Sequence, residues 1–451
     1  MPAVLETNSW GHLEFTEEFT QSYELLENSQ TNIFISGQAG TGKSTLLKYF
    51  RQKTKKNLAV LAPTGVAALN VQGQTIHSFF QFKPDITMDA IALIRLRKDR
   101  RKMYGSLETL IIDEISMVRA DLLDCIDAFL RLHGPKKDQP FGGIQMVFLG
   151  DLYQLPPVVT SFERGIFQNG DDSEGSVRYA SPFFFDAKSF KTLKLKCIEL
   201  KKIYRKKEQE FIDLLGKVRE KLISVEELKI INSRYFPNFE IPANEFYIYL
   251  TTTNEMADRI NHEELQKLKT RPYHFEGSID GDFELKNLPT SLSMDLRFGA
   301  QVMLLNNDSQ GRWVNGSIGK IVGVNSGDDV SDEVIVELSK KERVFVAPFT
   351  WQMYRFSYNE DTERIESEEV GSFTQYPLRL AWAITIHKSQ GKTFSKVILD
   401  IGTGTFSHGQ LYVALSRCTD MDGLILKKPI LRNHIILDSR IKNFFEAHHE
   451  Q

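Results

Sequence analysis

The chain has 451 residues, of which 41% are hydrophobic and 25% are charged. This ordinary globular composition excludes collagen-like, coiled-coil and largely disordered proteins, and the length predicts about two to four domains. The net charge is −3, so the molecule as a whole has no field that attracts a polyanion. Any such ligand would have to bind to local basic patches.

Neither a membrane-spanning nor a secreted protein is indicated. No stretch approaches the ~20 consecutive apolar residues needed to cross a bilayer, and residues 1–16 lack the basic flank and apolar run of a secretory signal. Cys125, Cys197 and Cys418 are too far apart for a zinc site or a disulfide framework. We therefore expect a cytoplasmic protein of bacterial type, without membrane association.

Helices and apolar strands alternate over the first 150 residues. After a helix at residues 17–27, strands are expected at residues 31–36, 58–62, 107–112 and 145–149, with helices at 44–52 and 66–70. Each strand ends in a polar or glycine-rich turn. Buried strands with polar residues at their carboxyl ends are typical of a parallel α/β sheet, whose ligand site lies off those ends.

The second half of the chain changes character twice. Core-type strands are expected at residues 246–250 and 397–401, and between them lie short alternating segments separated by Gly, Asn and Asp, at residues 301–305, 320–324, 334–338 and 343–347. This alternation predicts a small β-barrel. Exposed or acidic loops are expected at residues 169–177, 327–333 and 359–369. The predicted layout is two α/β units, with an all-β module inserted in the second.

Residues 37–44, GQAGTGKS, match the pattern G-x-x-x-x-G-K-[ST] between a strand and a helix. The glycines allow backbone N–H groups to converge on phosphate oxygens at a helix N-terminus. Lys43 should reach the β- and γ-phosphates, and the Ser44 hydroxyl should bind Mg²⁺. The predicted nucleotide-binding residues of this loop are Gly37, Ala39, Gly40, Thr41, Gly42, Lys43, Ser44 and Thr45.

Acidic, amide and guanidinium groups further along the chain complete a predicted hydrolysis site. Asp113 and Glu114 end an apolar run, so we expect Asp113 to hold Mg²⁺ and Glu114 to polarise the attacking water. Gln154 is a candidate sensor of the γ-phosphate. Arg417 would stabilise the transferring phosphoryl group if the second α/β unit packs across the nucleotide, and Arg205 is a second candidate. Both arginines could instead be surface or ion-pair residues.

Six segments occur in the order found in the PIF-type (petite integration frequency) DNA helicases of superfamily one, class B, which the chain resembles. They are residues 37–45, 62–80, 111–117, 145–158, 378–393 and 409–418. The resemblance implies an α/β fold with two RecA-like motor domains. The first would span residues 1–200, with a small insertion at about 66–105. The second would span residues 201–298 and 377–451, with an SH3-like barrel at 299–376.

The resemblance also implies ATP- and Mg²⁺-dependent 5′-to-3′ translocation on single-stranded DNA, with unwinding of duplexes and of G-quadruplexes. Roles in replication, repair, recombination or telomere maintenance would follow. It adds Gly391 to the ATPase residues. The sequence departs from the family at the glutamine that reads adenine, because Phe19 falls near its expected place and Gln21 lies two residues on.

Two similar segments are expected to line a DNA strand. Residues 75–80, TIHSFF, and residues 385–390, TIHKSQ, offer hydroxyls and an imidazole, with aromatic rings in the first and a cation in the second. For either segment alone, core packing with a helix cap is the alternative. By resemblance, the DNA-binding residues are Thr64, Gly65, His77, Ser78, Phe79, His387, Lys388 and Ser389.

Several alternatives stay open. The basic residues 91–101 are either an exposed helix face or a duplex-contacting insertion, and Trp313 either presses on the strand with Lys320 or belongs to the barrel core. The expected partners are single-stranded DNA, single/double-strand junctions and G-quadruplexes. We expect a monomer, with DNA-induced dimerisation as the alternative. The competing functions are a RecD-like subunit of a nuclease complex and a nucleotide switch that does not move on DNA.

Overall fold

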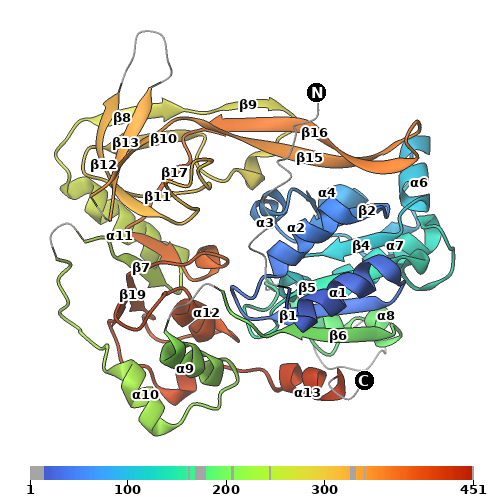
Figure 1. The fold of residues 1–451 in the computed structure, drawn as a ribbon, viewed down its shortest axis with the longest axis horizontal. Helices are drawn as coiled ribbons and strands as arrows, with labels where there is room; N and C mark the ends of the chain where they lie inside the picture. Colours follow the sequence, from blue (N-terminus) through green and yellow to red (C-terminus); the bar gives the residue numbers. More distant parts are fainter. Residues whose placement is uncertain are drawn as a thin grey trace.

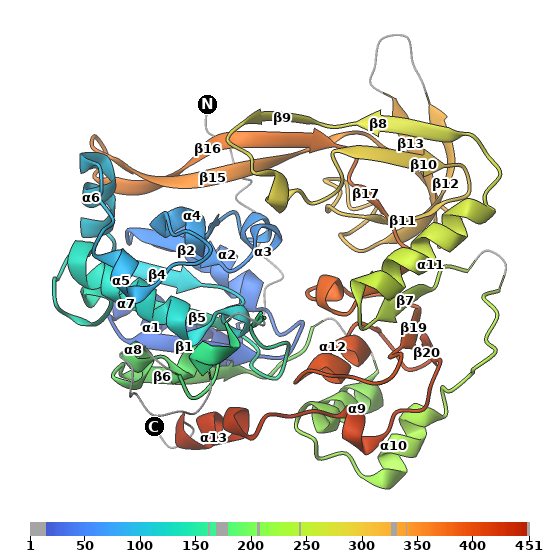
Figure 2. The same ribbon diagram turned by 180° about the vertical axis from the view of Figure 1, so that it is seen from behind.

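The computed structural model describes residues 15–160, 163–167, 179–204, 208–242, 245–325, 332–339 and 341–448. Two parallel α/β domains lie side by side, and an antiparallel module sits above the second domain and extends a long hairpin across the first (Figures 1 and 2). Among the described helices, none combines the length and the apolar character that a membrane span requires.

The first domain is built on a six-stranded parallel sheet with the order β3-β2-β4-β5-β1-β6. Its strands are β1 Asn32–Gly37, β2 Leu58–Ala62, β3 Gln74–Thr75, β4 Thr109–Ile112, β5 Gln145–Gly150 and β6 Leu195–Leu200. Its helices are α1 Glu17–Asn28, α2 Lys43–Lys53, α3 Gly65–Asn70, α4 Ile76–Phe80, α5 Met88–Ile91, α6 Lys98–Gly105, α7 Ala120–His133 and α8 Lys188–Lys191. Strands β4 and β5 are buried at every residue, as their mainly apolar sequences indicate.

The second domain has a four-stranded parallel sheet with the order β18-β7-β19-β20. The strands are β7 Ile248–Thr251, β18 Ala383–Thr385, β19 Val397–Asp400 and β20 Leu424–Leu426. The helices around it are α9 Gln209–Arg219, α10 Val225–Asn232, α11 Asn254–Lys267 and α12 Gln410–Ser416. The two parallel sheets confirm the predicted α/β fold.

The antiparallel module contains all four predicted alternating segments as strands. They are β11 Gln301–Leu304, β12 Ile318–Asn325, β13 Glu333–Leu338 and β14 Arg343–Val346, joined by β17 Leu378–Leu380 in one sheet. The pair β8 Pro272–Glu276 and β10 Ser293–Arg297 shares the same apolar core. The module therefore begins before residue 299, the predicted boundary. Strand β8 was missed because four of its five residues are exposed.

A long hairpin extends from this module over the first domain, and we call it the hairpin arm. It consists of β15 Phe349–Asn359 and β16 Arg364–Gln375, with β9 Ser278–Gly281 paired beside β16. The arm reaches α6, where Arg100 Nη1 donates to Phe356 O at 3.3 Å (Figure 2). The acidic stretch 359–369 is therefore mostly strand, not the predicted loop. The arm also covers Arg100, so residues 91–101 are not wholly a solvent-exposed face.

The C-terminal helix α13, Ser439–His448, packs on the first domain although it follows the second in sequence (Figure 1). Phe444 and Phe445 lie with their ring centroids 5.8 and 6.3 Å from that of Phe34, on β1. The predicted second domain, which extends to residue 451, therefore includes a helix that belongs structurally to the first. The apolar face of α13 is buried against the aromatic side chains of that domain.

Candidate nucleotide and DNA site

The glycine-rich loop predicted to bind phosphate forms a tight turn between β1 and α2. Gly42 has φ +93°, a left-handed conformation that favours glycine, and it precedes the first residue of α2. Lys43 Nζ donates to the carbonyl oxygens of Gly37 at 2.5 Å and Gln38 at 3.0 Å. Ser44 is exposed in the first turn of α2. The side chains of Lys43 and Ser44 therefore both lie where the glycine-rich loop joins α2.

The predicted acid pair lies at the carboxyl end of β4. Asp113 is buried, and its Oδ1 accepts a hydrogen bond from the Glu114 amide at 3.0 Å. Burial, reinforced by the neighbouring Asp113 carboxyl, raises the pKa of Glu114 to about 7. The charges of Lys43 and Arg417 oppose this rise in the pKa. A carboxyl of the first domain thus lies within electrostatic range of cations from both domains.

Gln154 follows β5 and is buried between the two domains. Its Nε2 donates to Asp151 Oδ2 at 3.1 Å, and its Oε1 accepts from Gln390 Nε2 at 3.3 Å. Gln390 Nε2 also lies 3.5 Å from Glu114 Oε2. The side chain of Gln390 therefore joins the second DNA segment to both predicted hydrolysis residues.

Arg417 lies at the end of α12 and is 1% exposed. Its guanidinium donates to Val413 O at 3.0 Å and Lys392 O at 3.0 Å, and Nη2 donates to Ser416 Oγ at 2.7 Å. These bonds hold the group within the second domain, close enough to Glu114 to act on its charge. Its contact with a phosphoryl group stays a prediction.

The other predicted ATPase residues are less constrained by the structure. Gly391 is exposed with φ +77°, and Gln21 is exposed on α1. Phe19, near the family's adenine-reading position, is buried. Arg205 lies outside the described residues.

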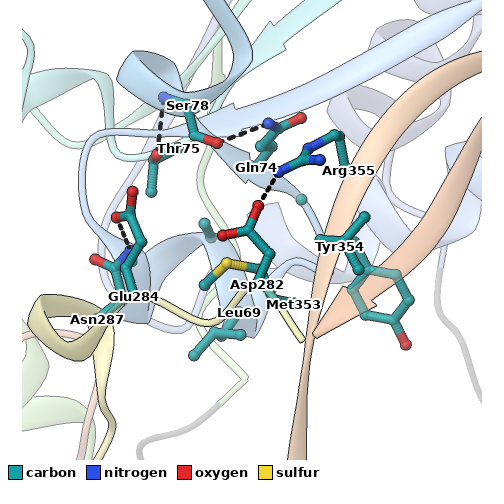
Figure 3. A pocket seen from close by; sticks show the side chains of 14 residues that line it. Leu69, Gln74, Thr75, Ser78, Asp282, Glu284, Asn287, Met353, Tyr354 and Arg355 are labelled. Atoms are coloured by element: carbon teal, nitrogen blue, oxygen red, sulfur yellow. Dashed lines mark hydrogen bonds and ion pairs between the residues drawn. The ribbon is translucent and has the colours of Figure 1, made fainter. Parts of the chain in front are cut away.

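The first DNA segment lines a pocket beneath the antiparallel module (Figure 3). Thr75 and Ser78 face Asp282, Glu284 and Arg355 from the other side of this pocket. Further lining residues include Gly65, Leu69, Gln74, Asn287, Met353 and Tyr354. Nearby, Thr64 accepts a hydrogen bond from Ala67 N and caps α3. A Cβ atom at Gly65 would collide with the Asn287 side chain, so the close approach requires glycine.

Two predicted DNA-binding side chains are buried in this conformation, so their contact with a strand stays a prediction. Phe79 is fully buried, and its ring lies 5.4 Å from Tyr104 and 6.0 Å from Phe356 between centroids. The short helix α4 turns it toward the core and leaves His77 half-buried. Ser389 is also fully buried. In the second segment, Lys388 is exposed and His387 is half-buried, and their contact with a strand stays a prediction.

Trp313 belongs to the barrel core, which decides between its two alternatives. It is 6% exposed, and its Nε1 donates to Asn306 Oδ1 at 3.0 Å. Lys320 remains exposed on β12.

Four polar residues at this site had no role predicted from the sequence, namely Asp151, Arg219, Gln390 and Tyr412. Asp151 is 1% exposed and accepts hydrogen bonds from Arg219 and Tyr412 of the second domain at 3.3 Å each. Asp151 directly follows β5, just as Asp113 directly follows β4. This position at the carboxyl end of a buried strand is the sequence signal that could have identified Asp151 as a site residue. Arg219 offered none, because it meets Asp151 across 68 residues of sequence.

Two parallel sheets with a phosphate-binding loop, an acid pair and a buried cation between them define a two-domain P-loop motor. Residues 17–228 match the family described as PIF1-like helicase, and residues 380–420 match the UvrD-like helicase C-terminal domain. The chain is 31% identical over 456 residues to the ATP-dependent DNA helicase Pif1 of Campylobacter jejuni, covering 92% of this chain and 95% of that protein. The chain therefore belongs to the Pif1 helicase family.

Other members of the family are longer. The human ATP-dependent DNA helicase PIF1 is 34% identical over 404 residues, which cover 87% of this chain and 58% of the human protein. The chain thus spans less than two thirds of the length of several curated relatives, the human protein among them.

Solved structures of Pif1 from Bacteroides, at 36% identity, cover 97% of this chain and 98% of theirs. The TM-score is 0.84 for the unliganded form and 0.85 for the complex with ADP-AlF4, whereas it is 0.65 for the form bound to ssDNA. Since the identity is the same in each case, the conformation described here is closer to the DNA-free forms.

Proposed function

We propose that this chain is an ATP-dependent DNA helicase that hydrolyses ATP between its two sheets and moves 5′-to-3′ on single-stranded DNA. The observation that carries this proposal is the position of Gln390. Its amide reaches Glu114 at 3.5 Å and Gln154 at 3.3 Å, although Gln390 ends the second DNA segment. A DNA strand bound to that segment would therefore affect the positions of Glu114 and Gln154, the residues proposed to act on ATP.

The chemistry follows from the side chains at the loop. When ATP binds, Lys43 would exchange the loop carbonyls for the β- and γ-phosphates. Glu114, whose pKa burial raises to about 7, would accept a proton from the attacking water, and Gln154 would orient that water against the γ-phosphate. Arg417 would stabilise the phosphoryl charge once the second domain closes on the nucleotide.

A magnesium ion fits the donors at this site. Ser44 offers an exposed hydroxyl and Asp113 a carboxylate, which are the hard oxygen ligands that Mg²⁺ prefers beside nucleotide phosphates. The described residues contain no group of three or more acidic, His or Cys side chains arranged for a metal, so phosphates and water would complete the coordination. Bound there, Mg²⁺ would neutralise charge on the β- and γ-phosphate oxygens.

Movement would come from closing and opening the cleft while the two DNA segments grip in turn. The solved Bacteroides Pif1 structures with ssDNA and forked dsDNA support DNA as the partner. We extend the proposal to single/double-strand junctions and G-quadruplexes, to a cytoplasmic monomer with DNA-induced dimerisation as the alternative, and to work in replication, repair or recombination.

Strand displacement from tailed duplexes tests this function. We expect ATP-dependent displacement from a 5′-tailed duplex and little from a 3′-tailed one. Lys43→Ala should abolish displacement and leave single-strand binding intact, because it removes the phosphate cation alone. Lys48→Ala, on the exposed side of the same helix, is the matched control and should unwind normally. Displacement by Lys43→Ala at the parental rate would overturn the proposal.

A further inference from the structure

A buried arginine that the proposed chemistry does not use lies between the two domains. Arg219 ends α9, which packs beside α12 of the second domain (Figure 1), and it is 5% exposed. Its Nη2 lies 3.3 Å from Asp151 Oδ1 and 3.2 Å from Glu199 Oε1. Its Cζ is 4.1 Å from the ring centroid of Tyr153. Burying a guanidinium costs free energy unless it is paired with an acceptor. The contacts with Asp151 and Glu199 therefore hold the Arg219 side chain in one position.

The carboxylate of Asp151 is shared between the domains. Arg219 binds its Oδ1, whereas Tyr412 OH donates to its Oδ2 at 3.3 Å, and both donors belong to the second domain. Gln154 Nε2 donates to the same Oδ2 at 3.1 Å from the first domain. The orientation of the Gln154 amide therefore depends on a carboxylate that the second domain holds through both of its oxygens.

We infer that Arg219 is a positioning residue, which sets the Gln154 amide against the γ-phosphate through Asp151 and thereby makes hydrolysis depend on how the two domains are placed. This inference rests on the proposed ATPase function and adds a route of regulation to it. A shift of the second domain moves Arg219 and Tyr412 together. The carboxylate of Asp151 then reorients, and the Gln154 amide follows.

The surroundings of Tyr153 extend the same connection. Tyr153 lies between Asp151 and Gln154 in sequence, and its ring stacks on Phe445 of α13 with the centroids 5.4 Å apart. Arg219 and α13 thus both contact the turn that carries Gln154. Because α13 packs on the first domain, its contact holds this turn within that domain, whereas Arg219 reaches the turn from the second domain.

The test compares Arg219→Gln and Arg219→Lys with the parent protein. The readouts are kcat and KM for ATP with saturating oligo-dT, and the affinities for ADP and for ADP with aluminium fluoride. We expect Arg219→Gln to lower the stimulated kcat about tenfold, the scale of coupling between contacting groups, with KM changed less than about threefold. Affinity for the aluminium fluoride complex should fall and affinity for ADP should hold, because only the former occupies the γ-position. Arg219→Lys should recover part of kcat.

A double-mutant cycle separates positioning from general stabilisation. In a Gln154→Ala background, Arg219→Gln should lower kcat by less than about twofold, because the amide through which it acts is gone. Full additivity of the two changes, or a folded Arg219→Gln protein with parental kcat, would overturn the inference. Arg259→Gln, an exposed arginine on α11, is the matched control and should leave all readouts unchanged.

Tyr412→Phe keeps the inference testable if Arg219→Gln does not fold. This change removes only the hydroxyl bound to Asp151 Oδ2 and should reproduce a smaller loss of kcat with the same insensitivity in the Gln154→Ala background. Parental kcat in Tyr412→Phe would then contradict the inference. The parent protein measured alone checks the underlying function, since a parent without DNA-stimulated hydrolysis refutes the motor itself.

Discussion

The two DNA segments, residues 75–80 and 385–390, resemble each other in sequence but differ in their surroundings. In the first, Thr75 and Ser78 face the carboxylates of Asp282 and Glu284 across a pocket (Figure 3). In the second, Lys388 is exposed, and Gln390 contacts the hydrolysis residues. The two segments therefore have similar sequences but different contacts. The second segment contacts Glu114 and Gln154, the residues proposed to act on ATP, whereas the first lies opposite the carboxylates of Asp282 and Glu284, which pair with Arg355 and Lys286.

The largest effect is expected from a substitution of Glu114, the proposed hydrolysis residue that Gln390 contacts. Glu114→Gln keeps the shape of the side chain and its contact with Gln390 but cannot accept a proton. We expect kcat to fall by about 10²-fold or more, with ATP and single-strand binding retained. Turnover close to that of the parent would assign proton transfer to another group, and equilibrium binding of a fluorescent nucleotide provides the control.

Gln390→Ala tests the link itself. It removes the amide that joins the second segment to Glu114 and Gln154, so DNA stimulation of ATP hydrolysis should fall about tenfold, with strand affinity changed far less. Ser78→Ala makes the corresponding change in the first segment and should leave kcat near that of the parent. Equal losses of kcat in both variants would contradict the claim that only the second segment is linked to the proposed hydrolysis residues.

Lys388→Ala measures the electrostatic part of strand binding in the second segment. Loss of one phosphate contact should weaken oligo-dT binding by about threefold to tenfold and reduce the slope of log K against log salt by about 0.7. Fluorescence anisotropy over a salt series gives both quantities. An unchanged slope would mean that Lys388 does not contact a phosphate of the strand.

The smallest effect concerns the carboxylates that face the first segment. Glu284→Gln should raise single-strand affinity about twofold at low salt, because phosphates would meet one negative charge fewer, and the gain should vanish at high salt. Glu276→Gln, an exposed acid on β8, controls for net charge and should have less effect. An equal gain in both variants would mean that the position of Glu284 opposite the first segment has no special role.

The predictable part of the molecule is the part in which local sequence decides the structure. Buried strands such as β4 and β5 show as mainly apolar runs, and the polar residues that end them, Asp113 among these, must gather at one edge of a parallel sheet. The glycine-rich loop is local as well, since Gly42 takes a conformation suited to glycine. The fold class and the gathering of these residues at one edge of the sheet could therefore be predicted.

The part that escaped prediction depends on contacts between distant segments. The hairpin arm meets the first domain through pairs such as Gln74 and Phe356, which are 282 residues apart. Arg219 looks like any helix arginine until Asp151 lies against it. The burial of Phe79 was not predicted, because an aromatic residue in a DNA-like segment and an aromatic core residue have the same sequence signature. Only tertiary packing distinguishes these cases.

The dependence of ATP hydrolysis on DNA tests the connection between strand and nucleotide most directly. The steady-state ATPase rate should be measured against oligo-dT concentration, with binding of the same oligonucleotide followed in parallel. A connection through Gln390 predicts a low basal rate and a saturable rise that follows strand occupancy. A rate that stays constant while the strand binds would contradict it and would favour a nucleotide switch over a motor.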